Sequence, residues 1–241
     1  MPVTDRAALE AAAELVHSVV PPTPQYAWPL LCARVGAEVW VKHENHTPTG
    51  SFKVRGGLVY LDEWVRSRPA VRTAVAATRG NHGQSVAFAA RRYGVEARIV
   101  VPHGNSVEKN AAMEAWGARV IVHGRDFREA WEHARALADR EGWHFVPSFH
   151  PLLSRGIASY ALELFRGVSR LDAVYVPIGL GSGICGVVAA RDALGLRTQV
   201  IGVVAERAPA YARSFDERRP VATPSADTFA DGLACRVPDP E

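Results

Sequence analysis

Residues 45–57 read Asn-His-Thr-Pro-Thr-Gly-Ser-Phe-Lys-Val-Arg-Gly-Gly, and the rest of the chain can be arranged around the lysine near their centre, Lys53. The preceding segment, 38–42, alternates polar and apolar side chains, which predicts a strand. Turn residues follow at 47–50, and Ser51 then predicts the N-cap of a helix. Lys53 is therefore expected in a first helical turn, just after a strand and a tight turn.

The start of a helix changes the chemistry of a lysine. The positive end of the helix dipole and partial burial both disfavour the ammonium form. A neutral amine can attack a carbonyl carbon and form a Schiff base. The alternative is a surface lysine, because lysines are mostly exposed. Residues 45–57 alone do not decide between these two interpretations.

Composition excludes several classes of protein. The chain has 241 residues, of which 48% are hydrophobic and 22% charged, typical of a soluble globular protein. Its net charge of +3 is small and basic residues are interspersed with acidic ones, so no nucleic-acid partner is expected. Cys32, Cys185 and Cys235 lie far apart, which favours a reducing compartment over a disulfide framework or a zinc site. Without a signal-like N-terminus or a long apolar run, we expect a cytoplasmic protein outside the membrane.

After residue 72, short β-branched runs alternate with longer amphipathic runs, which predicts parallel sheets covered by helices. The expected strands are 73–77, 97–101, 119–122, 143–146, 173–177 and 199–205. The expected helices are 84–93, 107–116, 126–140, 157–165 and 184–194. Pro151 and Gly156 interrupt the alternation, so the chain is expected to cross between two domains there.

The segment 78–84 joins a predicted strand to a predicted helix and reads Thr-Arg-Gly-Asn-His-Gly-Gln. Its two glycines let the backbone approach a ligand, and the free N–H groups at the coming helix start suit a carboxylate. Asn81 and His82 add side-chain hydrogen bonds. An ordinary polar turn remains the alternative.

The segment 179–183 reads Gly-Leu-Gly-Ser-Gly and again lies between a strand and a helix, which is the setting of a phosphate site. A second interpretation competes with it. Gly181, Gly183 and Gly186 fit G-x-G-x-x-G, and Glu206 follows at the distance expected of a dinucleotide fingerprint. On this loop alone, a phosphate cofactor, a dinucleotide and simple tight packing all stay open.

The three segments together are more specific. A Schiff-base lysine, a carboxylate loop and a phosphate loop are what pyridoxal phosphate acting on an amino acid needs, whereas a dinucleotide enzyme leaves Lys53 without a role. Residues 49–53, 80–84 and 179–183, in this order, resemble the fold-type II pyridoxal-phosphate enzymes, especially serine/threonine dehydratases. The resemblance continues to 228–232. It implies an α/β fold with two open, mostly parallel sheets covered by helices, similar to the tryptophan synthase β subunit.

The resemblance also implies a domain organisation. Residues 51–150 would form a smaller domain, inserted into a larger domain made of residues 1–50 and 151–241. Relatives carry a further C-terminal segment, with a hydroxyl or thiol residue facing the pyridine nitrogen, whereas this sequence stops at Glu241. The larger domain is therefore expected to be truncated: either the chain is a fragment, or the nitrogen partner is missing.

Site residues are likewise implied by the match to the family. The catalytic residue would be Lys53. The residues expected to bind pyridoxal 5'-phosphate are Phe52, Lys53, Asn81, Gly179, Leu180, Gly181, Ser182, Gly183 and Gly232. The residues expected to face the substrate carboxylate are Ser51, Thr78, Arg79, Gly80 and His82. Glu206 and the carbonyl of Ala210 would bind a cation, and a monovalent ion is favoured because Ala212 replaces the usual aspartate ligand.

The implied activity is that of an L-threonine or L-serine dehydratase (ammonia-lyase). Lys53 would take the α-proton, the β-hydroxyl would leave, and a 2-oxo acid and ammonia would result. The expected partners are a small amino-acid substrate and further copies of the chain in a homodimer or higher homo-oligomer. The alternatives are a serine racemase or hydroxyaspartate dehydratase, a nicotinamide-dependent oxidoreductase, and a non-catalytic amino-acid-binding protein.

Overall fold

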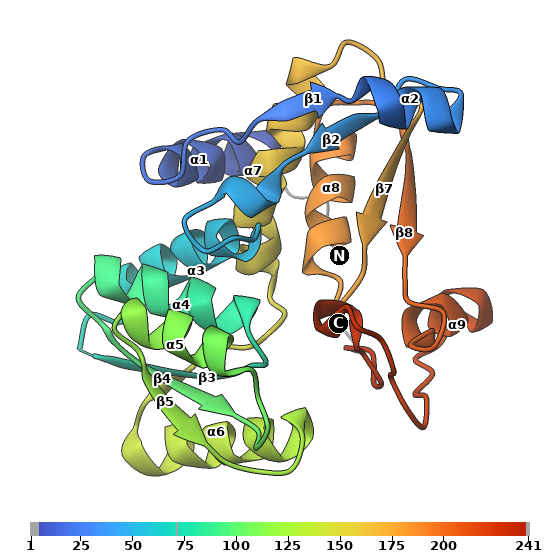
Figure 1. Ribbon diagram of the computed structural model, residues 1–241. Coiled ribbons are helices and arrows are strands. Elements are labelled where there is room, and N and C mark those ends of the chain that lie inside the picture. The colour runs from blue at the N-terminus through green and yellow to red at the C-terminus, as the bar shows by residue number, and fades with distance from the viewer. Residues whose placement is uncertain (1–4, 71, 240–241) are drawn as a thin grey trace.

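Four parallel strands form the sheet in the middle of the chain. The computed structural model describes residues 5–70 and 72–239, and its course is shown in Figure 1. The strands are β3 (Thr73–Ala77), β4 (Glu96–Val101), β5 (Arg119–Val122) and β6 (His144–Phe145), in the order β5-β4-β3-β6. Residues 74–77 are all buried, as expected of a parallel strand that is covered on both faces.

Helices cover both faces of this sheet because successive strand residues point to opposite faces. Ala74 and Ala76 pack in one core with α3 and α4, whereas Val75 and Ala77 pack in another core with α6. The helices are α3 (Lys53–Ser67), α4 (Asn81–Arg92), α5 (Val107–Ala115) and α6 (Phe127–Glu141). In Figure 1, α4 and α5 lie above the sheet and α6 lies below it.

The rest of the chain contains a second parallel pair, β7 (Ala173–Pro177) and β8 (Gln199–Val203). A third core joins β7 to α1, α7 and α8. The helices of this part are α1 (Arg6–His17), α2 (Pro29–Val35), α7 (Pro151–Gly167), α8 (Ser182–Ala193) and α9 (Ala210–Glu217). The other elements are the antiparallel strands β1 (Gln25–Ala27) and β2 (Trp40–Lys42) and the 3-10 turns η1 (Glu44–His46) and η2 (Asp231–Leu233).

Helix α7 supports both α3 and α8 through glycine contacts. A Cβ atom added at Gly156 would lie 2.3 Å from the carbonyl oxygen of Arg55 in α3. A Cβ atom added at Gly186 in α8 would lie 3.0 Å from the backbone nitrogen of Ala158. The absence of these Cβ atoms lets the three helices pack backbone to backbone. Helix α7 therefore sets the spacing between α3 and α8.

The structure confirms the expected α/β class with parallel sheets and covering helices, and adds the antiparallel pair β1–β2. The predicted start of α7 at residue 157 is wrong, because the helix begins six residues earlier. Pro151 begins α7, because proline suits the first helical position, and His150 caps the helix by accepting a hydrogen bond from the Leu152 N–H at 3.1 Å. Gly156 lies inside α7 because the absence of a Cβ atom there lets α3 pack against the helix. The four-stranded sheet lies within residues 51–150, and the division into domains at those bounds stays a prediction.

Across residues 5–70 and 72–239, none of the helices is both long enough and apolar enough to cross a membrane.

Candidate active site

Lys53 is the first residue of α3, and its amine lies beside the first residue of α8. The Nζ atom donates a hydrogen bond to the Ser182 hydroxyl at 2.8 Å, although the two residues are 129 positions apart in the chain. The side chain of Lys53 also lies against the ring of Phe52. The structure thus joins the predicted lysine to the predicted phosphate loop.

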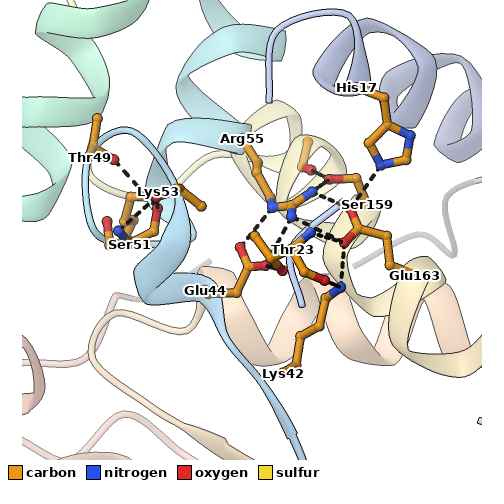
Figure 2. A network of polar contacts seen from close by, with 12 residues as sticks. His17, Thr23, Lys42, Glu44, Thr49, Ser51, Lys53, Arg55, Ser159 and Glu163 are labelled. Carbon is orange, nitrogen blue, oxygen red and sulfur yellow. Dashed lines mark hydrogen bonds and ion pairs between the residues drawn. The ribbon is translucent and has the colours of Figure 1, made fainter. Parts of the chain in front are cut away.

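Ser51 does not cap α3, contrary to the prediction. Phe52 occupies the N-cap position, and no side chain caps the helix there. The hydroxyl of Thr47 closes the turn instead, because it accepts from the Ser51 N–H at 3.0 Å and donates to the Ser51 carbonyl at 2.8 Å. Figure 2 shows Ser51 and Lys53 on this turn. Among the described residues the buried Ser51 hydroxyl has no hydrogen-bond partner, so it is free to bind a ligand group.

The chain has three lysines, and their surroundings differ. The amine of Lys42 lies 2.5 Å from a carboxylate oxygen of Glu163, and that of Lys109 pairs with Asp231. Within the described part of the chain, only the Lys53 amine faces a hydroxyl rather than a carboxylate. Burial lowers the pKa of Lys53 to about 8. Lys53 is therefore the lysine that can lose its proton near neutral pH and act as a nucleophile.

The loop between β3 and α4 is closed by Thr78. Its hydroxyl accepts hydrogen bonds from the N–H groups of Gly80 at 2.9 Å and Gly83 at 3.3 Å. His82 is buried, and its Nε2 atom has no partner in the described part of the chain. Burial, and then the charge of Lys53, lowers the pKa of His82 to about 3, so its ring is neutral at ordinary pH.

The loop before α8 contains three glycines, one with a left-handed backbone and two that other segments approach closely. Gly181 is the N-cap of α8 and has a φ angle of 93°, a left-handed conformation that favours glycine. A Cβ atom at Gly183 would lie 3.3 Å from the Cζ atom of Phe52, and one at Gly179 would lie 2.2 Å from the carbonyl oxygen of Gly232. The helix start thus presents N–H groups, without side chains in the way, next to the Lys53 turn.

Other predicted site residues are less closely joined to this centre. Arg79 and Asn81 are exposed, and Leu180 is partly buried. Glu206 is exposed, whereas Ala210 is buried at the start of α9. Residues 5–70 and 72–239 contain no group of three or more His, Cys, Asp or Glu side chains placed to hold a metal ion. The cation site stays a prediction.

Sequence reasoning missed three side chains that fix the Lys53 turn. Thr47 closes the turn, as described above, and the hydroxyl of Ser85 donates to the Lys53 carbonyl at 2.6 Å. Arg55 is fully buried and binds carboxylates from two other segments. Its signal in the sequence is a charged residue inside the otherwise apolar and glycine-rich start of α3.

These residues fit pyridoxal phosphate. The cofactor needs an amine that can react with its aldehyde, an anion site for its phosphate and donors for its polar edge. The Lys53 amine and the Gly181 loop supply the first two side by side. The unpartnered Ser51 hydroxyl and the unpartnered His82 ring nitrogen are further polar atoms in described residues around the lysine. At Gly181 the nearest atom to an added Cβ is 3.9 Å away, so the backbone there is open to a ligand.

Comparisons with known proteins agree with this fit. A family model described as pyridoxal-phosphate dependent enzyme matches residues 16–241. The biosynthetic L-threonine dehydratase of Escherichia coli (strain K12) is 34% identical over 222 residues, which is 92% of this chain and 43% of that protein. The L-threonine ammonia-lyase of Thermotoga maritima is 36% identical over 207 residues, or 84% of this chain and 51% of that protein.

A solved structure is also similar. The processed form of threonine deaminase isoform 2 from Solanum lycopersicum matches with a TM-score of 0.89 and 29% sequence identity, over 97% of this chain and 68% of that one. The chain spans about half the length of the curated relatives it matches. The family model, however, covers nearly all of the chain, including the lysine turn and both glycine loops. The chain therefore belongs to the pyridoxal-phosphate dependent enzymes of fold-type II.

Proposed function

We propose that the protein containing this chain is a pyridoxal-phosphate dependent L-threonine or L-serine dehydratase, which converts a β-hydroxy amino acid to a 2-oxo acid and ammonia. The observation that carries the proposal is the position of the Lys53 amine, which lies 2.8 Å from Ser182 at the start of α8 and pairs with none of the carboxylates in the described residues. The threonine dehydratase and ammonia-lyase names of its relatives support the choice of reaction.

In this proposal, α3 and the loop before α8 hold different parts of the cofactor. When bound, pyridoxal phosphate supplies an aldehyde for an amine to attack and a ring that withdraws electrons from the α-carbon of the substrate. Lys53 would hold it covalently and would later take the α-proton of the substrate. The phosphate is held at the start of α8. The residues of that loop are Gly179, Leu180, Gly181, Ser182 and Gly183.

Further contacts to the cofactor come from three other places. Phe52 packs beside the ring, which its position between Lys53 and Gly183 supports. Asn81, which is the first residue of α4, would bind the ring oxygen of the cofactor. Gly232 lies against the cofactor, and its proximity to Gly179 supports this placement.

The substrate is held by the residues of the two other loops. We propose that Ser51 and the loop Thr78 to Gly80 bind its carboxylate, and that neutral His82 supplies a further hydrogen bond. The unpartnered Ser51 hydroxyl and His82 ring nitrogen support this assignment, since buried polar atoms are usually hydrogen-bonded. Arg79 is assigned to the same carboxylate by resemblance alone, and its side chain is exposed.

The first test is the replacement of the lysine. Lys53→Ala should lower the formation of 2-oxo acid from L-threonine or L-serine by about 1,000-fold or more, because both the covalent holder and the base are lost. Borohydride treatment of the wild-type protein with pyridoxal phosphate should label the Lys53 peptide, as read by mass spectrometry. Lys53→Arg, which keeps a charge but cannot be labelled, is the matched control. Label on Lys42 or Lys109 instead, or full turnover by Lys53→Ala, would refute the proposal.

The same reaction separates a dehydratase from a racemase. In the racemases that the sequence resembles, a serine just before Gly-Asn-His returns a proton to the second face of the α-carbon, and here that position is Arg79. A guanidinium keeps its proton at any ordinary pH and is a poor proton relay. We therefore expect much more 2-oxo acid than D-serine from L-serine, measured by coupled dehydrogenase and chiral chromatography. A D-serine yield equal to the 2-oxo acid would favour a racemase.

A hydroxyaspartate dehydratase remains the second candidate, and a screen of β-hydroxy amino acids on the full-length protein decides between the substrates. We propose a monovalent cation at Glu206 and the Ala210 carbonyl, a homodimer or higher homo-oligomer, and a cytoplasmic location. The three free cysteines support the last of these.

A further inference from the structure

A cluster of buried charged side chains lies next to the Lys53 turn, around a residue in the first turn of α3. Its centre is Arg55, whose exposed fraction is 0%. We name it the Arg55 cluster, and its members are His17, Thr23, Lys42, Glu44, Arg55, Ser159 and Glu163 (Figure 2). These residues come from α1, the segment before β1, β2, η1, α3 and α7. Six separate parts of the chain therefore meet in one cluster, in which Arg55 binds Glu44, Ser159 and Glu163, and the two glutamates bind the other members.

All five N–H groups of the Arg55 guanidinium are used. Nε and Nη2 donate to the two carboxylate oxygens of Glu44, at 2.7 and 2.9 Å. Nη1 and Nη2 donate to the two carboxylate oxygens of Glu163, at 2.5 and 3.2 Å. The remaining Nη1 hydrogen goes to the Ser159 hydroxyl at 3.0 Å. A lysine has three donors on one atom, so it cannot make this planar set of contacts.

The carboxylates of Glu44 and Glu163 also have hydrogen-bond or ion-pair partners besides Arg55. Glu163 accepts from Lys42 at 2.5 Å, from the Thr23 N–H at 3.2 Å and from His17 at 2.8 Å. Burial alone would raise the pKa of Glu163, but the charge of Arg55 and these hydrogen bonds outweigh it and lower the pKa. Two cations, Arg55 and Lys42, thus balance two anions, and the cluster holds the surrounding segments in one arrangement.

This arrangement bears on Lys53 through the geometry of α3. Successive residues of a helix are about 100° apart, so Arg55, two positions after Lys53, points to nearly the opposite face. Arg55 is held on that face by η1, which leads into the turn before Lys53, and by α7, which also supports α8. The backbone of Arg55 is held as well, because its carbonyl oxygen packs against Gly156, 2.3 Å from where a Cβ atom of that residue would be.

We propose that Arg55 is a positioning residue for Lys53. By holding Glu44 of η1 and Glu163 of α7, it fixes the first turn of α3 and thereby the place of the Lys53 amine relative to the start of α8. The inference deepens the proposed function and rests on it, because the amine needs a fixed position only if it reacts there. A misplacement by about 1 Å is enough to slow a reaction strongly.

The test compares Arg55→Lys with Arg66→Lys in the full-length protein. Arg66 lies on the same helix, but its ion pair with Asp62 is at the surface. Two quantities are measured: the rate at which pyridoxal phosphate and borohydride label Lys53, and the affinity for deoxypyridoxine phosphate, which has the phosphate but no aldehyde. Arg55→Lys should be labelled at least about tenfold more slowly, with an affinity for the analogue within about threefold of wild type. Arg66→Lys should change neither.

A purely structural role predicts a different result. It would lower labelling and analogue affinity by the same factor, and this outcome overturns the proposal, as does labelling of Arg55→Lys at the wild-type rate. If Arg55→Lys does not fold, Ser159→Ala removes only one of the five acceptor contacts and should slow labelling by a smaller factor, again with analogue affinity kept. Equal labelling of Ser159→Ala and wild type then overturns the proposal. Absence of label on Lys53 in the wild type refutes the proposed function itself.

Discussion

Gly181 is the residue at which both the backbone conformation and the charge of a bound anion restrict the side chain. Its φ angle of 93° lies in the left-handed region, and it stands at the N-terminus of α8, where an anion is stabilised. Space is not the constraint, since the nearest atom to an added Cβ is 3.9 Å away, on Phe149. A side chain here would act through strain and charge.

The expected result for Gly181→Asp is a loss of phosphate binding. A carboxylate at the place of the phosphate should cost about 2–4 kcal/mol of binding free energy, or roughly 30- to 1,000-fold in the dissociation constant of deoxypyridoxine phosphate, measured by calorimetry. Gly195→Asp is the matched control, because Gly195 follows the other end of α8 with a φ angle of 67° and nothing within 4 Å of an added Cβ. Equal affinities for the two variants would place the phosphate elsewhere.

At the scale of elements, α7 is the common support of the two helices that carry the site. Gly156 lets α3 approach it, and Gly186 lets α8 approach it, so the distance between Lys53 and Ser182 depends on both contacts. Backbone atoms cannot move aside as side chains can. The addition of a single methyl group at this crossing is therefore expected to lower the free energy of unfolding.

Gly156→Ala should lower the free energy of unfolding by about 1–3 kcal/mol, because the new Cβ atom would lie 2.3 Å from the Arg55 carbonyl oxygen. The measurement is urea unfolding followed by circular dichroism. Gly167→Ala, at the end of the same helix, is the control, since the atom nearest to its Cβ is the amide end of the Gln25 side chain, which can rotate away. Similar losses in both variants would mean that helix packing at Gly156 is not the cause.

At the scale of the whole molecule, buried titratable groups make stability depend on pH. Burial lowers the pKa of His82 to about 3 and that of His144 to about 4, from an ordinary value of 6.5. In the unfolded chain these rings protonate near pH 6.5, whereas in the folded chain they stay neutral. Their stabilising contribution is complete above pH 6.5 and is lost as the pH falls towards 4. The lowered pKa of Glu163 adds a further loss below about pH 4.5.

The free energy of unfolding should therefore fall between pH 7.5 and pH 5, by up to about 2 kcal/mol for the buried His82 and by less for the partly buried His144, because solvent screens the latter. Urea unfolding at the two pH values measures the difference. His144→Phe keeps an aromatic ring against Trp64, with which His144 stacks at 4.4 Å, and should show a smaller fall. His103→Asn, at an exposed position, should show the wild-type fall. An unchanged fall in His144→Phe would contradict the assignment to His144.

The sequence by itself determined the elements and the chemistry they carry. The spacing of hydrophobic residues and the turn residues are local signals. They predicted the bounds of β3, β5 and β7 as the structure has them. They also placed two glycine loops between strands and helices. They failed at Pro151 and Gly156, because a proline can begin a helix and a glycine can serve a helix crossing. The role of Gly156 is visible only with the neighbouring helix in place, whereas a proline at the start of a helix is a local signal, here interpreted as a break.

Only the tertiary structure decided which of these residues act together. The contact of Lys53 with Ser182 joins positions 129 residues apart. The pairing of Lys42 and Lys109 with carboxylates leaves Lys53 as the lysine whose amine has no carboxylate partner among the described residues. Arg55 acquires its partners in the same way, from segments before and far after it. Such contacts depend on how helices pack across the fold, and packing is set by complementary shapes and burial that no local pattern records.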